Sequence, residues 1–343
     1  MTDTSPLPRA THYGDDHVAY VFPGQGSQFV GMGRDIYESS PAAQRVFQQA
    51  DEVLGFPLSR MCFEGPTEDL QDTINAQPAI LTVSVASLEA LREKLRDIGR
   101  LVQPLYVAGH SLGEYTALVA ANVLDFADAL RLVRERGRLM KESGETRPGG
   151  MAAIVGLDRE KLEDVCRRAG KIGVITLANQ NEPLQTVISG EINALLHAMD
   201  LAKQEGARKV ARLKINIASH SPLMSKVATG LTEMVANMTL RDPEVPIVAN
   251  IGGQVLSTAE DIRRELAEQV CKPVEWSRSV LEMINGGGRT FVEIGPGHVL
   301  SSLIRRINAE VQAVTVKDFS LAQLLPVSAA GLPGALSNAE GSA

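Results

Sequence analysis

A serine flanked by glycines is the first place in the sequence whose residue types suggest chemistry. Ser111 lies in GHSLG (109–113), directly after the apolar run 105–108 and before the helix-like run EYTALVAANVL. In a G-x-S-x-G pattern the glycines permit a turn so sharp that the serine hydroxyl stands above a sheet at the start of the next helix. Ser111 is therefore either an exposed nucleophile or an ordinary helix cap.

A nucleophilic serine needs a base, and the sequence offers six histidines: His12, His17, His110, His197, His220 and His298. The first two lie in or beside a polar N-terminal segment, His197 falls in a helix-like run, and His110 adjoins the serine on a turn too tight for it to point back. His220, in IASHSP (217–222), lies at a junction between two parts of the chain, where a cleft is expected. His298 follows GPG (295–297) and is either a base or a helix-capping residue. The pattern favours His220.

The oxyanion formed in acyl transfer needs backbone N–H donors, usually one from the residue after the nucleophile and one from an earlier loop. Leu112 follows Ser111, and the loop PGQG (23–26) after the first strand offers the N–H of Gln25. A glycine-rich loop can also cradle phosphate. This one lacks the Gly-Lys-Ser/Thr ending of a P-loop and the full dinucleotide fingerprint.

An arginine lies on the apolar side of a predicted helix. At 100° per residue, Arg136 falls in the middle of the apolar face of the run 129–141, whose other charged residues share the opposite face. An unpaired buried guanidinium costs on the order of several kcal/mol, and its natural partner is a carboxylate held by two hydrogen bonds. That carboxylate belongs either to the protein itself or to an acidic acyl substrate.

Strands alternate with helices on both sides of a differently ordered segment. Runs 17–22, 105–108, 246–252 and 290–295 are strand-like and are separated by helical patterns, which indicates a mostly parallel sheet. The segment 149–217 instead reads strand, helix, strand, strand, helix, strand, which is the ferredoxin-like order. We expect a large domain of residues 17–148 and 218–318 with a ferredoxin-like subdomain of residues 149–217 inserted into it. Residues 1–16 and 319–343 are predicted to form a loose leader and a flexible tail.

Composition narrows the class of protein. A content of 44% hydrophobic and 22% charged residues is typical of a globular protein with a sizeable core. The net charge of −7 argues against nucleic-acid binding. Three scattered cysteines (Cys62, Cys166 and Cys271) suggest neither a disulfide framework nor a metal site, which fits the cytoplasm. The polar N-terminus and the lack of an apolar run of about 20 residues argue against a membrane protein.

Six motifs together resemble one family. GQGSQ (24–28), GHSLGEY (109–115), an arginine 25 residues after the serine, SHS (219–221), QVCKPVEW (269–276) and EIGPGHVL (293–300) occur in the order found in malonyl-CoA:acyl carrier protein transacylases. These include the fatty-acid enzyme and the free-standing acyltransferases of polyketide synthesis. The resemblance runs from about residue 18 to 316. It implies an α/β-hydrolase-like large domain, a ferredoxin-like insert and ping-pong transfer through an acyl-serine.

By motif position, the resemblance also implies roles for individual residues. Ser111 is expected to be the nucleophile, His220 its base and Arg136 the clamp on the malonyl carboxylate. Gln25 and Leu112 match the oxyanion donors, and Gln269 matches the position whose backbone carbonyl orients the histidine. Ser219 occupies a position linked to the choice between malonyl and methylmalonyl extenders, but both kinds of enzyme carry serine there. Leu112 leaves less room for a branched acyl chain, which puts malonyl first.

We therefore expect a monomeric acyltransferase that needs no cofactor or metal and acts on malonyl-CoA and an acyl carrier protein. Two other classes share some of these residues. An acyl-thioester hydrolase would use the same serine and histidine but has no use for Arg136 when its acyl chains are uncharged. A non-catalytic carrier-binding module would need neither Ser111 nor His220.

Overall fold

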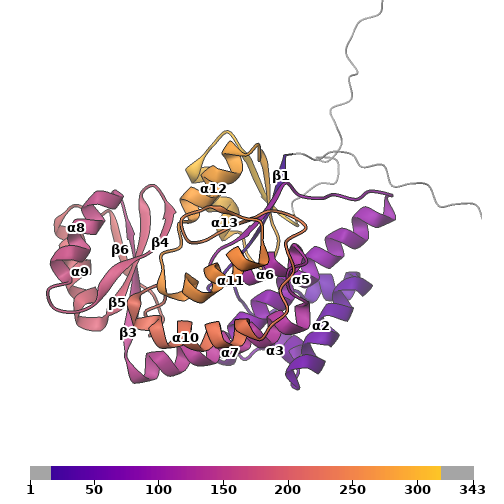
Figure 1. The fold of residues 1–343 in the computed structure, drawn as a ribbon, viewed down its shortest axis with the longest axis horizontal. Helices are drawn as coiled ribbons and strands as arrows, with labels where there is room; N and C mark the ends of the chain where they lie inside the picture. Colours follow the sequence, from indigo (N-terminus) through magenta and orange to yellow (C-terminus); the bar gives the residue numbers. More distant parts are fainter. Residues whose placement is uncertain (1–16, 318–343) are drawn as a thin grey trace, which may run out of the picture.

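The computed structural model describes residues 17–317. The predicted leader (1–16), the predicted tail (319–343) and His12 lie outside the described residues. Figure 1 shows two units side by side, a larger one that holds both ends of the described chain and a smaller one built from a continuous central segment.

The larger unit is built on a six-stranded sheet. Its strands lie in the order β10 (Gln312–Thr315), β9 (Thr290–Glu293), β1 (Val18–Phe22), β2 (Tyr106–Gly109), β7 (Ile247–Val248) and β8 (Val255–Leu256). All neighbours are parallel except β8, which pairs antiparallel with β7 at one edge. The predicted mostly parallel sheet is confirmed. The short strands β8 and β10 were not predicted.

Helices cover both faces of this sheet. Alternate residues of β1 point to opposite sides, so that Tyr20 and Phe22 pack in one core with α2, α5, α6, α7 and α10, whereas Ala19 and Val21 pack in a second core with α12 and α13. The helices of this unit are α1 (Arg34–Ser39), α2 (Pro41–Leu54), α3 (Leu58–Glu64), α4 (Thr67–Gln71), α5 (Thr73–Asp97), α6 (Gly113–Ala120), α7 (Phe126–Thr146), α10 (Ser225–Ala236), α11 (Ala259–Glu268), α12 (Trp276–Asn285) and α13 (Val299–Ile307).

Helix α5 passes through the middle of the larger unit. By length and composition alone it meets the criteria for a membrane span, with a mean hydropathy of 1.2 over its most apolar 18 residues, although we expected no such stretch. Of that window 83% is buried inside the protein. Its apolar character is accounted for by packing against α2 and α7 in the core.

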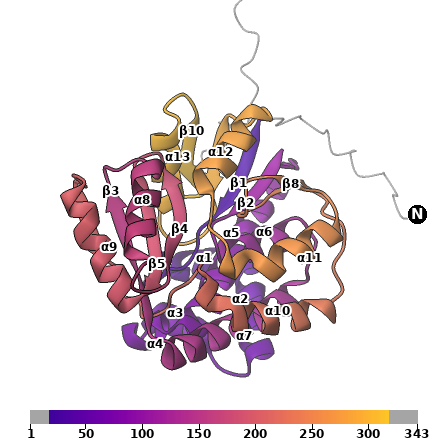
Figure 2. The ribbon, with the colours of Figure 1, turned by 60° about the vertical axis from the view of Figure 1, so that its left-hand side comes forward.

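The smaller unit is a four-stranded antiparallel sheet with two helices. The strands β3 (Gly149–Val155), β4 (Ile175–Glu182), β5 (Gln185–Glu191) and β6 (Lys209–Arg212) lie in the order β4-β5-β3-β6. Helices α8 (Arg159–Ala169) and α9 (Ile192–Gln204) share one core with the sheet. Figure 2 shows both helices beside this sheet. The predicted sequence of strands and helices in this segment is confirmed.

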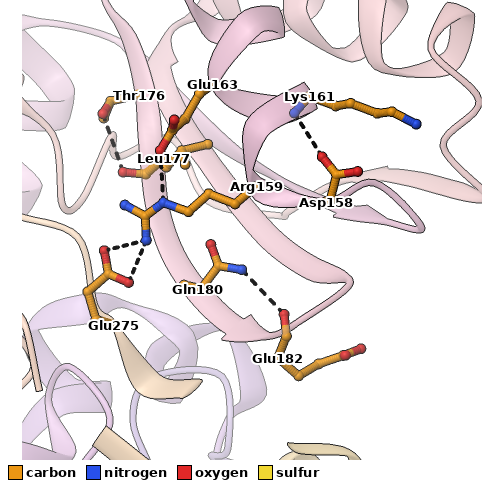
Figure 3. A network of polar contacts seen from close by, with 9 residues as sticks. All are labelled: Asp158, Arg159, Lys161, Glu163, Thr176, Leu177, Gln180, Glu182 and Glu275. Carbon is orange, nitrogen blue, oxygen red and sulfur yellow. Dashed lines mark hydrogen bonds and ion pairs between the residues drawn. The ribbon is translucent and has the colours of Figure 1, made fainter. Parts of the chain in front are cut away.

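Backbone pairing joins the two units. Val274, in the segment before α12, donates its N–H to Ala178 O (2.8 Å) and accepts from Gln180 N (2.8 Å), so that one residue of the larger unit pairs in parallel with Asn179 at the edge of the smaller sheet. Beside this pairing, the Arg159 guanidinium bridges Glu163 on its own helix and Glu275 of the larger unit (Nη1–Oε2 2.9 Å; Figure 3). These contacts fix β4 against the end of the larger sheet.

The register of the parallel strands brings several loops to one edge of the sheet. Phe22 of β1 lies opposite Gly109 of β2, so the loops that follow both strands leave the sheet together. The loop after β7 begins at the same edge, since Val248 lies opposite Ala108. In open α/β sheets ligands bind at this carboxyl edge.

Gly113 packs directly against the backbone at the end of β1. A Cβ at Gly113 would lie 2.0 Å from Phe22 O and 2.9 Å from Pro23 O, both in backbone at the end of a central strand. We expect Gly113→Ala to lower the free energy of unfolding by more than ~2 kcal/mol because neither carbonyl can move without distorting the sheet. Thermal unfolding measures this, with Gly170→Ala as control, since a Cβ there meets nothing closer than 3.0 Å. Equal melting temperatures for the two variants would contradict the prediction.

Candidate active site

The turn between β2 and α6 holds Ser111 in a strained conformation. Ser111 has a φ of 52°, and a Cβ at Gly109 would lie 1.9 Å from Gly113 C, so the turn closes only with glycine there. Asn250, two residues after β7, braces the turn: its Oδ1 accepts from Ser111 N (2.7 Å) and its Nδ2 donates to Gly109 O (2.7 Å). The predicted strand–turn–helix context of Ser111 is confirmed.

His220 contacts the serine hydroxyl. Its Nε2 lies 2.7 Å from Ser111 Oγ, and its Nδ1 lies 2.9 Å from Gln269 O and 3.1 Å from Lys272 O. Carbonyl oxygens only accept, so Nδ1 carries the proton and Nε2 is free to accept one from Ser111 Oγ. The side chain is 2% exposed, and its φ of 58° is held by a hydrogen bond from its own N–H to Val270 O.

The environment keeps this imidazole neutral. Burial, and then the positive charge of Arg136, lower the pKa of His220 to about 3. A neutral imidazole is the form that removes a proton from a hydroxyl.

The other histidines of the described chain do not contact Ser111 Oγ. His110 Nε2 lies 2.9 Å from Asn181 Oδ1 of β4, His298 takes the N-cap position of α13, and His17 Nδ1 lies 3.0 Å from Gly287 O. His197 is exposed on α9. Of the two histidines that the sequence left open, His220 is the one beside the serine.

Arg136 is buried beside the serine. It is 1% exposed; Nη2 lies 3.2 Å from Ser111 Oγ and 3.3 Å from Gln269 Oε1, and Nη1 donates to Gln77 Oε1 (2.7 Å). Its guanidinium also lies 5.4 Å from the centre of the Tyr115 ring. Among residues 17–317 Arg136 forms no salt bridge, and its Nε has no hydrogen-bond partner. The direct hydrogen-bond partners of the guanidinium are neutral; burial lowers the pKa of Arg136, and nearby Tyr115 and Glu114 partly oppose that shift.

The two candidate oxyanion donors flank the turn. Leu112 is buried at the N-cap position of α6, and Gln25 is exposed in the loop after β1, where its Oε1 accepts from Thr73 Oγ1 (3.1 Å). The loop abuts the turn, since a Cβ at Gly24 would lie 2.3 Å from His110 O. Within the described chain neither the Leu112 nor the Gln25 N–H forms a hydrogen bond. Their role as a pair stays a prediction.

Gln269 forms several hydrogen bonds at the site, whereas Ser219 is placed there only by its burial. Besides its carbonyl contact with His220, Gln269 uses its side-chain Nε2 to donate to Ser111 O (2.9 Å) and Glu114 Oε2 (2.5 Å). Ser219 is buried next to His220, and its predicted part in acyl selectivity stays a prediction.

Several residues at the site were not found from the sequence. Some groups hydrogen-bond to the predicted residues or to the backbone that positions them: Gln77, Asn250, the carbonyl of Lys272 and the buried carboxyls of Glu114 and Glu265. Gln77 could have been found from the sequence as a polar residue within the apolar run of α5. The same kind of signal, a polar residue on an apolar helix face, indicated Arg136 in α7. A backbone carbonyl such as that of Lys272 leaves no signal in the sequence.

The fold and this site define an α/β acyl-transfer enzyme built around a serine. Residues 19–340 match the family model described as acyl transferase domain. The malonyl CoA-acyl carrier protein transacylase of Bacillus subtilis is 44% identical over 302 residues, which cover 88% of this chain and 93% of that protein. The enzyme of the same name from Escherichia coli is 40% identical over 289 residues, covering 84% and 92%.

Solved structures agree with these sequence matches. The malonyl CoA-acyl carrier protein transacylase of Coxiella burnetii superimposes with a TM-score of 0.83 at 37% identity, covering 88% of this chain and 93% of that one. A malonyl-transacylase solved in complex with a type II PKS acyl-carrier protein gives a TM-score of 0.84 at 38% identity, covering 90% and 97%. The chain belongs to the acyl transferase domain family and, within it, to the malonyl CoA-acyl carrier protein transacylases.

The low pKa of His220 leads to a pH prediction. Ser111 should remain reactive toward a small neutral acyl donor well below pH 6.5, because the imidazole stays unprotonated in the folded protein. Arg136→Met should move the acid limb of this reaction to higher pH, because the second cause of the lowered pKa is removed while burial stays. The acylation rate is measured against pH by intact mass, with circular dichroism to confirm folding. An acid limb at or above pH 6.5 in the unchanged protein would refute the assignment.

Proposed function

We propose that this enzyme transfers a malonyl group from coenzyme A to the phosphopantetheine thiol of an acyl carrier protein through an ester on Ser111. The observation that carries the proposal is the position of Arg136, a buried cation 3.2 Å from the serine hydroxyl that forms no salt bridge within residues 17–317. An anionic acyl group would supply the missing counter-charge. The names of the relatives and of the solved neighbours support the same substrate and carrier.

The proposed reaction has two symmetrical halves. His220 Nε2 accepts the proton of Ser111 Oγ while the oxygen attacks the thioester carbon, and the oxyanion rests on the N–H groups of Leu112 and Gln25. The intermediate collapses to the acyl-serine, and the coenzyme A thiolate leaves with the proton from His220. The carrier thiol then gives its proton to His220, attacks the ester and releases Ser111 by the same path.

The clamp acts because its surroundings exclude water. Gln77 holds Nη1 at 2.7 Å, whereas Nη2 faces the serine and can turn toward a carboxylate on the acyl group. A hydrogen bond to a charged group contributes about 1.5–3 kcal/mol, which corresponds to a selectivity of roughly 10- to 100-fold for a malonyl over an uncharged acyl group. This use for Arg136 favours transfer of an acidic acyl group over hydrolysis of uncharged chains.

We assign the rest of the predicted organisation on the same basis. Residues 17–148 and 218–318 form an α/β-hydrolase-like catalytic domain, and residues 149–217 form a ferredoxin-like subdomain, which the strand order β4-β5-β3-β6 supports. The reaction is complete with side chains and backbone N–H groups, so we propose that no resident cofactor or metal takes part. We further propose a cytoplasmic monomer, with malonyl rather than methylmalonyl as the acyl group.

Intact-mass measurement tests the transfer directly. Incubation with malonyl-CoA should add one malonyl group to the protein, and a phosphopantetheinylated carrier protein should remove it, because the ester is protected until a thiol arrives. Ser111→Ala should remain unlabelled. Steady release of free malonate without a carrier would instead identify a hydrolase, and the absence of any adduct would identify a non-catalytic module.

Arg136 can be compared with a neighbour on the same helix. Arg136→Ala should lower kcat/KM for malonyl-CoA by roughly 10- to 100-fold and leave acetyl-CoA unchanged or improved, because only the malonyl carboxylate loses a partner. Arg138→Ala is the matched control, since Arg138 is 51% exposed and pairs with Glu135 and Glu142 at the surface. Equal losses for both acyl groups would contradict the clamp.

A further inference from the structure

Two buried carboxyl groups lie beneath the serine turn and were not part of the predicted site. Glu114 is 1% exposed and Glu265 is 4% exposed. Glu114 Oε1 accepts from Asn250 N (3.1 Å), and Glu265 Oε1 accepts from Ile251 N (2.8 Å), so both carboxyls hold the backbone that follows β7. Neither forms a salt bridge within the described residues.

The two carboxyls bind the N–H groups of the consecutive residues Asn250 and Ile251 and lie near enough to influence each other's pKa, so we infer a hydrogen bond between them. Ionised carboxylates only accept hydrogen bonds, so a bond between two of them requires that one keeps its proton. Burial raises the pKa of both carboxyls, and the nearby charge of Glu114 adds to the effect at Glu265, so the pKa is about 7 for Glu114 and about 9 for Glu265. Glu265 is therefore the donor, and Glu114 keeps its oxygens for accepting.

Glu114 determines which way the Gln269 amide points. Because Glu114 Oε2 only accepts, the group facing it at 2.5 Å must be Nε2 of Gln269, which also donates to Ser111 O. The amide oxygen Oε1 is thereby turned toward Arg136 Nη2 (3.3 Å). In the reversed orientation the amide NH₂ would face the guanidinium, donor against donor, and Ser111 O would lose its hydrogen bond from Gln269 and keep only the one from Glu114 N.

We propose that Glu114 and Glu265 share one proton and act together as positioning residues, holding Gln269 so that its side chain serves Arg136 and Ser111 while its backbone carbonyl serves His220. The inference rests on the proposed malonyl transfer, because its main consequence is the position of the clamp. One hydrogen-bonded unit thus sets the geometry of nucleophile, base and clamp together.

Other charged and titratable groups face the pair. Arg136 of α7 and the Tyr115 hydroxyl of α6 interact electrostatically with Glu114, and Asp261, Arg264 and Glu268 line the same surface cavity as Glu265 on α11. Burial raises the pKa of Tyr115, so this hydroxyl stays neutral as the pair begins to ionise. Loss of the shared proton at alkaline pH would leave two buried negative charges side by side and release Gln269.

Two amide variants of equal size separate positioning from simple burial. In Glu265→Gln, the NH₂ can donate to Glu114 and the oxygen can accept from Ile251, so every hydrogen bond is kept. In Glu114→Gln, an NH₂ group replaces one of two acceptors, so either the Gln269 amide or the Asn250 N–H, which both position the serine turn, loses its partner. Glu293→Gln is the control, because Glu293 is also fully buried but only accepts from Leu300 and Ser301 at the start of α13.

Acylation of the full chain is measured first with malonyl-CoA and with acetyl-CoA. If the unchanged protein forms no malonyl ester, the proposed function fails and not this inference. Given that ester, we expect Glu114→Gln to lower kcat/KM for malonyl-CoA by about tenfold or more, with a smaller loss for acetyl-CoA. The loss of kcat/KM for malonyl-CoA should be smaller in Glu265→Gln than in Glu114→Gln. In Glu265→Ala this loss should be as large as in Glu114→Gln.

The pH profile supplies a readout that a purely structural role would not move. Above pH 4.5, the ordinary glutamate pKa, the unfolded chain has released this proton, whereas the folded protein still holds it. The contribution of the pair to the free energy of unfolding therefore falls as pH rises. The stability of Glu265→Gln relative to the unchanged protein should therefore increase with pH, and its activity should persist further into the alkaline range. If Glu114→Gln, Glu265→Gln and Glu293→Gln match in activity, acyl selectivity and pH profile, the proposal is wrong.

Discussion

The structure depends on a cation held in a dry interior without a carboxylate of the described chain in direct contact with it. Arg136 keeps its charge because neutral oxygens surround it: Gln77 and Gln269 through their amides and Ser111 through its hydroxyl. Such an arrangement costs more than a salt bridge as long as the site is empty, and that cost is recovered when an anion enters. The same charge lowers the proton affinity of His220. In the proposed reaction, substrate selection and base strength are therefore linked through one guanidinium.

Much of the remaining architecture serves to hold neutral hydrogen-bond partners at fixed distances from this group. The carboxyl ends of β1, β2 and β7 deliver the Gln25 loop, Ser111 and Asn250 to one edge of the sheet. The segment 269–272 then closes over the histidine with two backbone carbonyls. A backbone acceptor in place of the usual aspartate adds no negative charge beside the imidazole, which is consistent with the low pKa of His220.

The sequence predicts the parts of this site that depend on side-chain identity and chain order. The spacing around Ser111 indicates its turn, the helical position of Arg136 indicates a buried charge, and the strand and helix pattern of 149–217 indicates the inserted unit. It does not predict contacts formed by folding alone. Asn250 lies 139 residues after Ser111 and meets it only through the pairing of β2 with β7. The short strands β8 and β10 are likewise defined by their neighbours and not by their own composition.

The pairing of a single residue, Val274, with the edge of β4 limits how this fold can be re-engineered. The two units meet through backbone hydrogen bonds and through the salt bridge between Arg159 and Glu275. An insert taken from another protein must therefore reproduce the edge of β4 as well as the surface around it. In a chimaera cut at the ends of the insert, any slip in the register of this pairing would move Asn181 of β4 away from His110. When the two units are recombined among relatives, the register of the backbone pairing between β4 and Val274 must be kept. Crossover points within β4 would disturb this register most.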